Sequence, residues 1–476
     1  MDEAENKKRS HRGNVSRFFE PRRIAIIGSF KEGFFGGYVI VKSLMNSGYG
    51  GRIYPVNPAY KEVHGLKVYP SIKEVPKTVD LVFILINARS VVKVVRECAQ
   101  SGVRAFIVVS DGFAERDLKG KHLQKELLSY AREHGLRIIG PNTAGVVNTA
   151  NGFNPCPYEA GYYKFRHGPV AVCAQTGMIN PQAYPYPLLR FGVSKICDFG
   201  NKCDLDECDM LEYLEDDPDT QVISMYLETI CDGKKFLGTA KRVASQKPVL
   251  ILKSGRTREG AKASVSHTGG LAVDDKIFEA TCNQAGILRI DTFAELFEIP
   301  KVFASQPLPE GNRLGIVTFT GGIAVLAIDE AAKYQLDIPS LGTKTADFLD
   351  AIFPGLGTMP VDIGPVMAAV KEAFDRYPKI LDAVMSDKNV NALFNVLWAN
   401  YTGDIIERYI EAYEGIKNRY RKPVATWIYG PSAQSTSELA GRLEDRGFPV
   451  FTRPETAIKA LGLAWRHAST RYGART

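Results

Sequence analysis

The sequence predicts an α/β protein built from three doubly wound units, each with a mostly parallel sheet. Short segments rich in Val, Ile and Leu alternate with amphipathic segments of helical period along almost the whole chain. Many of the apolar segments end in glycine, serine or asparagine, as parallel strands do where the chain turns towards a helix. A length of 476 residues is too great for a single core, so several domains are expected.

The first unit is expected over residues 17–150, after a polar tail at residues 1–16 that we expect to be disordered. It opens with an apolar strand at Arg23–Gly28, which leads through a glycine-containing loop into a helix at Tyr38–Asn46. Further strands are expected at Arg52–Val56, Leu81–Ile86, Ala105–Val109 and Arg137–Ile139, and further helices at Ser90–Gln100 and Leu118–His134.

Small and polar residues stand at the carboxyl end of every one of these strands, where open α/β sheets bind their ligands. The residues concerned are Gly28, Ser29, Gly33, Asn57, Pro58, Asn87, Ser110 and Asn142. The glycines do not follow the G-x-G-x-x-G spacing, and Asn57 stands where an NAD site needs an acid to hold the ribose. The sequence therefore predicts a ligand site other than an ordinary NAD site, with plain turn residues as the alternative.

A second α/β unit is expected over residues 165–306. Its strands are predicted at Val170–Ala174, Lys195–Phe199, Val222–Leu227 and Val249–Leu252, and its helices at Asp204–Glu215, Lys234–Ser245 and Ala272–Ala285. The turn Gln175-Thr176-Gly177 could present backbone N–H groups and a hydroxyl to a phosphate. Three prolines, at positions 181, 185 and 187, interrupt the helix that would otherwise follow this turn.

Two ionisable residues of the second unit are candidates for chemistry. Glu228 follows the strand at Val222–Leu227, and His267 lies in a loop rich in glycine, serine and cations that spans residues 253–270. Glycine lets the backbone approach a ligand, cations attract anions, and histidine can carry a proton or a transferable group near neutral pH. The alternatives are that Glu228 caps a helix or is solvated, and that His267 merely packs or caps a helix.

The third unit is expected over residues 310–470. It repeats the pattern of strand, glycine turn and helix from Arg313, and continues with strands at Ala392–Leu397 and Val424–Tyr429 and a helix at Asp404–Arg419. No Walker A, zinc-protease or nucleophile-elbow pattern occurs in the sequence.

Composition narrows the class of protein. A net charge of +7 without a basic cluster argues against nucleic acid, and the absence of an 18-residue apolar run argues against a membrane span. The eight cysteines are dispersed, as is typical of reduced thiols, so we expect a cytoplasmic protein. The spacing of Cys197, Cys203 and Cys208 is unusual for zinc, so we expect no metal site and small buried side chains instead.

Nine short motifs occur in a characteristic order: Ile26–Ser29, Tyr54–Pro58, Gly65–Ser71, Gly140–Asn142, Gln175–Gly177, Gly200–Lys202, Tyr226–Glu228, Ser266–Gly269 and Pro360–Asp362. In this order and spacing the chain resembles the α subunit of NDP-forming (ADP-forming) acyl-CoA synthetases. These are the acetate–CoA ligase group, which is related to succinyl-CoA synthetase. The resemblance covers about residues 17–470.

The resemblance implies a Rossmann-like CoA-binding domain followed by two flavodoxin-like ligase domains. Coenzyme A would then lie along the strand ends of the first unit, on the small and polar residues named above. His267 matches the family's phosphohistidine and Glu228 the acid that steadies it. The implied phosphate-binding residues are Gln175, Thr176, Gly177 and Gly269.

The family also implies a partner, an ATP-grasp β subunit that binds ATP or ADP with Mg²⁺, in an α2β2 assembly. The implied reaction interconverts acyl-CoA, ADP and phosphate with a small carboxylic acid, CoA and ATP, through an acyl phosphate and phospho-His267.

Some positions depart from the family pattern, namely Phe34 and Phe35, residues 178–187, and Val273-Asp274. They leave the carboxylic acid open. They also leave two alternatives: a lyase or transferase that uses CoA or acyl-phosphate chemistry on another substrate, and a non-catalytic CoA-binding regulatory subunit.

Overall fold

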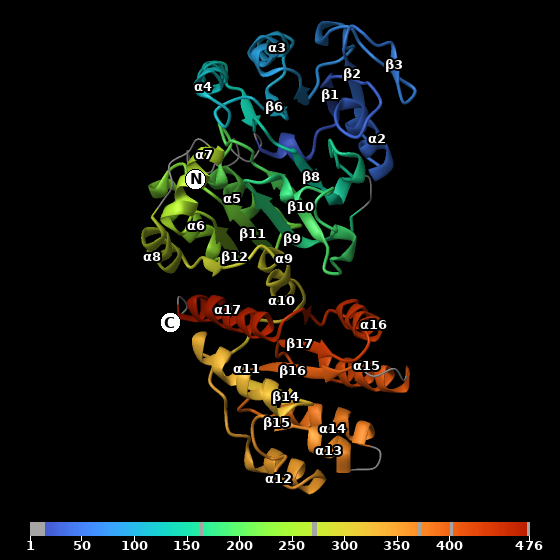
Figure 1. Ribbon diagram of the computed structural model, residues 1–476, viewed down its shortest axis with the longest axis vertical. Coiled ribbons are helices and arrows are strands. Elements are labelled where there is room, and N and C mark those ends of the chain that lie inside the picture. The colour runs from blue at the N-terminus through green and yellow to red at the C-terminus, as the bar shows by residue number, and fades with distance from the viewer. Residues whose placement is uncertain (1–14, 162–164, 269–273, 370–372, 400–402, 474–476) are drawn as a thin grey trace, which may run out of the picture. The chain divides into compact units, whose positions relative to one another are not determined.

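The computed structural model describes residues 15–161, 165–268, 274–369, 373–399 and 403–473. The chain forms two compact units that divide between Thr292 and Phe293. The first unit holds two of the three predicted sheets and the second unit holds the third (Figure 1).

The first sheet has five parallel strands in the order β2-β1-β5-β6-β7. The strands are β1 (Arg23–Gly28), β2 (Arg52–Val56), β5 (Leu81–Leu85), β6 (Ala105–Val108) and β7 (Arg137–Ile139), and the helices are α2 (Gly37–Ser47), α3 (Ala88–Gln100) and α4 (Leu118–Glu133). The predicted doubly wound fold is thus confirmed. The short hairpin of β3 (Glu62–Val63) and β4 (Leu66–Lys67) was not predicted.

Side-chain caps explain where two helices of this sheet, α3 and α4, begin. Asn87 accepts a hydrogen bond from the backbone N–H of Arg89 at the start of α3, and Asp117 accepts one from Gly120 at the start of α4. The strand order reverses between β1 and β5, since the chain leads from β1 to β2 on one side and from β5 to β6 on the other. In folds of this kind, ligands bind at that switch point, outside the carboxyl ends of the strands.

The second sheet has the order β13-β12-β11-β9-β10-β8. Its strands are β8 (Val146–Asn148), β9 (His167–Ala174), β10 (Val193–Asp198), β11 (Val222–Leu227), β12 (Val249–Lys253) and β13 (Leu288–Ile290), and its helices are α5 (Glu207–Glu215), α6 (Gly233–Ala244), α7 (Arg258–Thr268) and α8 (Asp275–Ala285). The interrupted segment after Gln175 forms only two 3₁₀ turns, η4 (Gly177–Ile179) and η5 (Tyr186–Leu188), as its prolines indicate. Strand β8 pairs antiparallel with β10, although its residues fall within the range predicted for the first unit.

The segment around His267 is where the structure differs most from the prediction, which was a basic loop. Residues 258–268 form α7, and the hydroxyl of Thr257 accepts a hydrogen bond from Gly260 N at 3.0 Å. Alanine, lysine and glutamate in this segment favour a helix over the loop that its glycine and serine content predicts. The next helix starts at Asp275 rather than Ala272, because Asp274 caps it by accepting bonds from Lys276 N and Ile277 N.

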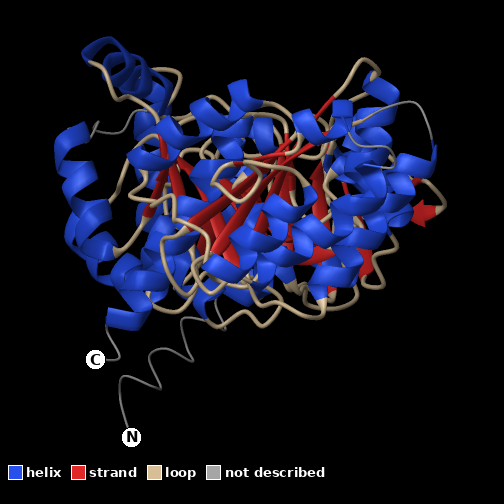
Figure 2. Ribbon diagram, turned by 90° about the horizontal axis from the view of Figure 1, so that it is seen from below, coloured by secondary structure: helices blue, strands red, loops and turns tan. Residues whose placement is uncertain are grey.

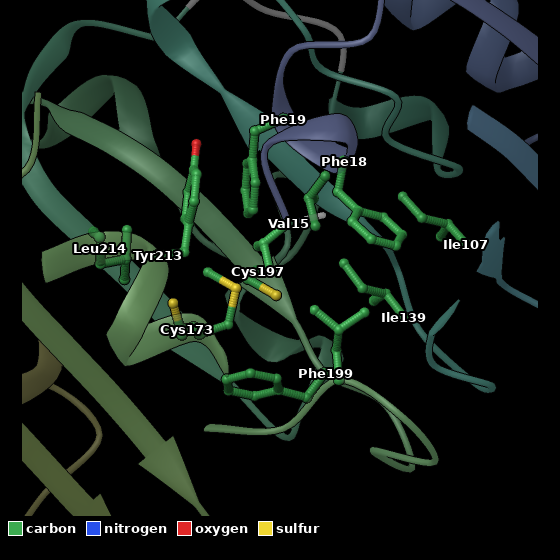
Figure 3. Packing of buried hydrophobic residues seen from close by; sticks show 14 of the residues in the cluster. Val15, Phe18, Phe19, Ile107, Ile139, Cys173, Cys197, Phe199, Tyr213 and Leu214 are labelled. Carbon is green, nitrogen blue, oxygen red and sulfur yellow. The ribbon is translucent and has the colours of Figure 1, made fainter. Parts of the chain in front are cut away.

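A shared apolar core joins the first two sheets into one compact unit. Figure 3 shows Phe18 and Phe19 between Ile107 of the first sheet and Cys173 of the second. The ring of Phe19 stacks on Tyr213 with 5.0 Å between centroids. Val15, which the sequence analysis assigned to a disordered tail, is buried in this core. The predicted tail therefore ends earlier than expected, because residues 15–19 bury apolar surface between the sheets.

The second compact unit has a parallel sheet in the order β15-β14-β16-β17-β18. Its strands are β14 (Leu314–Thr318), β15 (Val361–Asp362), β16 (Ala392–Trp398), β17 (Val424–Tyr429) and β18 (Val450–Phe451). Its helices are α9 (Glu295–Glu298), α10 (Pro300–Ser305), α11 (Gly321–Lys333), α12 (Thr343–Ile352), α13 (Gly364–Ala369), α14 (Ala373–Ser386), α15 (Gly403–Lys417), α16 (Ala433–Glu444) and α17 (Pro454–Gly473). Figure 2 shows the strands enclosed by helices.

Helices α9 and α10 belong to the second compact unit, whereas the sequence analysis placed them with the second sheet. Lys459 of α17 pairs with Glu295 of α9 at 2.8 Å, and Lys301 of α10 pairs with Glu444 of α16 at 2.7 Å. In the part of the chain that the structure describes, no helix is long and apolar enough to cross a membrane.

Candidate functional site

A cavity of about 690 Å³ lies in the first compact unit, at the carboxyl ends of strands from both of its sheets. The segments that surround it are the ends of β5 and β6, the chain after β7, the turn after β9, the end of β10 and the segments that carry Phe35 and Tyr158. The lining residues are Phe35, Leu85, Ile86, Asn87, Val109, Ser110, Asp111, Asn142, Thr143, Ala144, Tyr158, Gln175, Thr176, Gly177, Asp198, Gly200 and Asn201. This volume is within the usual range for a small-molecule site.

Three of the predicted CoA residues, Asn87, Ser110 and Asn142, line the cavity. The hydroxyl of Ser110 accepts a hydrogen bond from Ile86 N at 3.0 Å and so fixes the end of β5 against the end of β6. Asn142 has a left-handed backbone with φ 59°, and its N–H donates to the carbonyl of Ser110 at 2.9 Å. The strand ends are therefore held together by hydrogen bonds that leave the Asn87 and Asn142 side chains exposed.

The other five predicted CoA residues, Gly28, Ser29, Gly33, Asn57 and Pro58, lie at the ends of β1 and β2 and are not among the residues that line the cavity. Asn57 links the two strands, because its Nδ2 donates to the carbonyl of Gly28 at 2.8 Å. A Cβ atom at Gly28 would lie 3.0 Å from the carbonyl oxygen of Leu85, a tight contact, so the close packing of β1 on β5 favours glycine there. These residues continue the same sheet edge beyond the cavity.

Gln175 lines the cavity, and its side-chain amide forms hydrogen bonds within the protein. It is only 3% exposed, and its Oε1 accepts hydrogen bonds from the backbone N–H groups of Glu228 at 2.8 Å and Thr229 at 3.0 Å. Its Nε2 donates to the Thr229 hydroxyl at 3.1 Å. Gln175 therefore ties the turn after β9 to the segment after β11.

Thr176 and Gly177 follow Gln175 in the turn after β9 and also line the cavity. The Thr176 hydroxyl caps η4 by accepting a bond from Met178 N at 3.3 Å. A Cβ atom on Gly177 would lie 3.6 Å from Asn180 Nδ2, an ordinary van der Waals contact, so this position does not require glycine for lack of space.

Glu228 is buried at 5% exposure, which excludes the solvated alternative. The cap of α6 is provided by Asp232 instead, which accepts a bond from Lys235 N at 3.0 Å. The hydroxyl of Tyr226 donates to Glu228 Oε1 at 3.1 Å, and burial raises the pKa of Tyr226 to about 12. Glu228 is therefore a positioned, buried acid.

A buried ion pair holds the same segment from the other side. Lys202 Nζ lies 2.6 Å from Glu207 Oε2 and 2.7 Å from the carbonyl oxygen of Thr229, to which it donates. Glu207 Oε1 accepts a bond from Cys231 N at 2.9 Å. Residues 228–231 are thus fixed by Gln175 on one side and by this ion pair on the other.

His267 belongs to the last turn of α7, and its side chain lies outside the described part of the structure, as does Gly269. Two cations that precede His267 in the sequence have hydrogen-bond or ion-pair partners. Lys253 is 2% exposed and donates to the carbonyl of Ser254 at 2.8 Å, and burial lowers its pKa. Arg256 pairs with Asp291 at 2.7 Å.

Asp198 is a site residue that the sequence analysis missed. It ends β10, lines the cavity and is 4% exposed. Its Oδ2 accepts a hydrogen bond from Ala144 N at 2.7 Å and its Oδ1 one from Gly200 N at 3.1 Å. Burial raises the pKa of this carboxyl to about 6, although the N–H donors oppose the rise. An acid at the carboxyl end of a predicted strand is the signal that could have identified it.

An aromatic pair forms one wall of the cavity. The rings of Phe35 and Tyr158 lie 5.0 Å apart, and the backbone of Glu159 donates to the carbonyl of Phe34 at 3.0 Å. The Phe34 side chain itself is 76% exposed. The departures at positions 34 and 35 therefore lie beside the cavity, at its margin.

The three clustered cysteines, Cys197, Cys203 and Cys208, are buried among core residues, as predicted. All eight cysteines are free thiols. Over the described ranges, no group of three or more His, Cys, Asp or Glu residues is arranged to hold a metal ion.

Known proteins match this chain over nearly all of its length. Two family models match: a CoA binding domain at residues 22–149 and a succinyl-CoA ligase like flavodoxin domain at residues 167–303. The chain is 36% identical over 451 residues to the acetate–CoA ligase [ADP-forming] II subunit alpha of Pyrococcus furiosus, covering 93% of this chain and 95% of that protein. It is also 36% identical over 460 residues to acetate–CoA ligase [ADP-forming] II of Archaeoglobus fulgidus, covering 95% of this chain and 67% of that protein.

A solved structure has the same fold. It is that of a Ca. Korarchaeum cryptofilum acetyl-coenzyme A synthetase in complex with phosphate and ADP. The TM-score is 0.85 at 30% sequence identity, covering 96% of this chain and 97% of that one. The predicted fold class and the predicted family resemblance are confirmed.

Proposed function

The chain belongs to the family of ADP-forming acetate–CoA ligases, and on that premise we propose that it is the α subunit of an acid–thiol ligase. The enzyme interconverts acyl-CoA, ADP and phosphate with a carboxylic acid, CoA and ATP. One observation carries the proposal: the cavity brings the β5 and β6 strand ends together with the turn at Gln175–Gly177, and Gln175 holds the backbone of Glu228. In this proposal CoA and phosphate meet in the cavity, and Glu228 acts from the segment that Gln175 holds.

CoA occupies the edge of the first sheet in this proposal. Asn87, Ser110 and Asn142 contact its thiol-bearing arm in the cavity. The residues at the ends of β1 and β2, which are Gly28, Ser29, Gly33, Asn57 and Pro58, hold the phosphate-bearing end beyond it. The support is the continuity of this edge, since Asn57 joins β2 to β1 and Ser110 joins β5 to β6.

Phosphoryl transfer takes place at the second sheet. In the direction that makes ATP, phosphate attacks the thioester, giving an acyl phosphate and CoA, and the imidazole of His267 then takes the phosphoryl group. Glu228 holds the imidazole in its nucleophilic tautomer. The hydroxyl of Thr176 and the backbone of Gly177 and Gly269 offset the phosphate charge. Gln175 contributes by fixing Glu228 rather than by touching the phosphate, because both ends of its amide are already bonded.

We propose an ATP-grasp β subunit as the partner, in an α2β2 assembly, with ATP or ADP and Mg²⁺ bound there. The Pyrococcus relative is named as a subunit alpha, and the Archaeoglobus relative continues for about a third of its length beyond what this chain spans. Phospho-His267 passes its phosphoryl group to ADP on that partner. The buried, positioned state of Glu228 favours this over a purely regulatory CoA-binding role.

Labelling with ATP tests the proposal. The chain and its partner are incubated with γ-labelled ATP and Mg²⁺. We expect acid-labile, base-stable label on the wild type and none on His267→Ala. His122→Ala, which changes a histidine of α4, serves as the matched control and keeps the label. Label that persists in His267→Ala, or that never appears on the wild type with its partner present, contradicts the proposed function.

A further inference from the structure

The cavity carries an unexpected charge for a site that handles anions. None of its lining residues among those the structure describes is a lysine, arginine or histidine, and two of them, Asp111 and Asp198, are acids. Asp111 is exposed, whereas Asp198 is buried. A carboxylate without a cation beside it repels phosphate and carboxylate ligands. Asp198 is therefore unsuited to binding an anion, and its place in the cavity indicates another role.

Asp198 borders both halves of the cavity. On the CoA side, its Oδ2 accepts the N–H of Ala144, which follows the Asn142 segment. On the phosphate side, the same oxygen lies 4.0 Å from the position that a Cβ atom would occupy on Gly177. The carboxylate thus lies where the sulfur of CoA and the phosphate of an acyl phosphate would meet.

Backbone hydrogen bonds hold the carboxylate in one orientation, and its oxygens can accept further hydrogen bonds. Each oxygen takes one backbone N–H bond, from Ala144 or Gly200, and a carboxylate oxygen can accept a second. The Thr143 hydroxyl donates to the backbone carbonyl of Asp198 and fixes the strand end. Asp198 is therefore a preorganised acceptor rather than a mobile surface acid.

The groups around Asp198 leave it able to change protonation state. Tyr158 and Cys197 interact with it electrostatically, Asp111 also lines the cavity, and none of these three groups is a cation. Burial raises the pKa of Asp198 to about 6, and it raises the pKa of Cys197 and Tyr158 as well, so the thiol and the phenol stay protonated near neutral pH. Among these groups, Asp198 is the one suited to accept a proton at neutral pH.

We propose that Asp198 shuttles a proton between the thiol of CoA and the phosphate during the acyl-transfer step. This inference rests on the proposed function and adds a catalytic residue to it. When acyl-CoA forms, the ionised carboxylate takes the thiol proton as sulfur bonds to the acyl carbon. The carbon–oxygen bond to phosphate then breaks, the oxygen keeps the bonding electron pair, and Asp198 returns the proton to that oxygen. Asp198 ends ionised, and the reverse reaction follows the same steps backwards.

The test separates acyl transfer from phosphorylation. The complex of the chain with its partner is given acetyl phosphate and CoA without nucleotide, and the thioester is measured. For Asp198→Asn we expect a rate about 100-fold lower than wild type, a typical loss for a missing acid–base group. Labelling of His267 by ATP stays within about twofold of wild type, because that step does not use the thiol. Loss of labelling in the wild type would count against the proposed function instead.

The pH profile excludes a merely structural effect. The wild-type rate falls as pH drops through about 6, because the carboxylate becomes protonated, and Asp198→Asn lacks this limb. Asp111→Asn removes the same charge from the cavity, and Thr143→Val loosens the same strand end, yet both keep the limb. A limb that persists in Asp198→Asn, or a change of preferred acid without loss of rate, overturns the shuttle.

The binding of CoA provides a second test, which needs no acyl group. We expect wild type at neutral pH to bind CoA more tightly than a CoA analogue without the sulfur, because the thiol donates to Asp198. Asp198→Asn loses most of that preference. An equal preference in both proteins contradicts the contact on which the shuttle depends.

Discussion

Two buried acids lie at the carboxyl ends of two strands of one sheet and are held in different ways. Asp198 ends β10 and Glu228 follows β11, on either side of β9. The chain around Glu228 is fixed by side chains, with Gln175 on one side and Lys202 on the other. Asp198 is held by backbone N–H groups and faces the cavity. One sheet edge can thus supply an acid that orients another group and an acid that exchanges a proton.

The largest effect is expected where the support of Glu228 is broken. Lys202 and Glu207 form an ion pair whose side chains are 1% and 0% exposed. Replacing Lys202 by methionine leaves the Glu207 charge buried and unpaired, so we expect the free energy of unfolding to fall by about 3–5 kcal/mol. Denaturant unfolding measures the change.

Lys235→Met is the matched control for this variant. The Lys235 side chain is 37% exposed and its Nζ lies 3.6 Å from Asp209 Oδ1 of α5, the helix that also carries Glu207. Its loss costs about 1 kcal/mol or less, because solvent screens the pair. Equal losses in the two variants would contradict the view that the buried pair supports residues 228–231.

A smaller effect on the free energy of unfolding is expected from the ionisation of Asp198. At high pH the ionised carboxylate lowers the stability of the folded protein. Its carboxyl has an ordinary pKa of 3.8, raised by burial to about 6 in the folded protein. The folded state therefore binds this proton more tightly than the unfolded chain does. The stability that results is fully present below about pH 4 and is lost as pH rises through about 6.

Replacing Asp198 by asparagine removes this dependence. Relative to Asp198→Asn, the wild type should lose about 3 kcal/mol of unfolding free energy between about pH 4 and pH 7. Unfolding of both proteins across this range measures the difference. A difference that does not vary with pH contradicts a raised pKa at Asp198.

The smallest effect on stability is expected for Glu228→Gln, which keeps the shape of the side chain and the bond from Tyr226. Labelling of His267 should slow by about 100-fold, since the imidazole loses the charge that orients it. CoA binding, measured by calorimetry, should be unchanged because Glu228 does not line the cavity. Labelling at the wild-type rate removes Glu228 from the mechanism.

The sequence predicted those elements whose structure depends on residues close together in the chain. Apolar runs such as Val222–Leu227 form strands at the predicted positions, and the ends of such strands supply residues of the cavity. Helix α7 was missed because its glycine and serine content suggests a loop, while its helix-forming residues and tertiary setting decide otherwise.

The features that the sequence did not predict depend on contacts between residues far apart in the chain. Strand β8 joins the second sheet by pairing with β10, a strand that follows only after the whole of β9. Gln175 binds the backbone of a residue 53 positions away, and Asp198 that of one 54 positions away. No local pattern encodes such contacts, so the hydrogen bonds of Gln175 and the presence of Asp198 in the cavity emerge only from the fold.

The most direct test compares the two acids in two partial reactions of the same complex. One is labelling of His267 by ATP, and the other is thioester formation from acetyl phosphate and CoA. We predict a crossover: Asp198→Asn retains labelling and loses thioester formation, whereas Glu228→Gln retains thioester formation and loses labelling. If both variants lose both reactions to the same extent, or if either loses only the reaction assigned to the other, the division of roles between β10 and β11 is wrong.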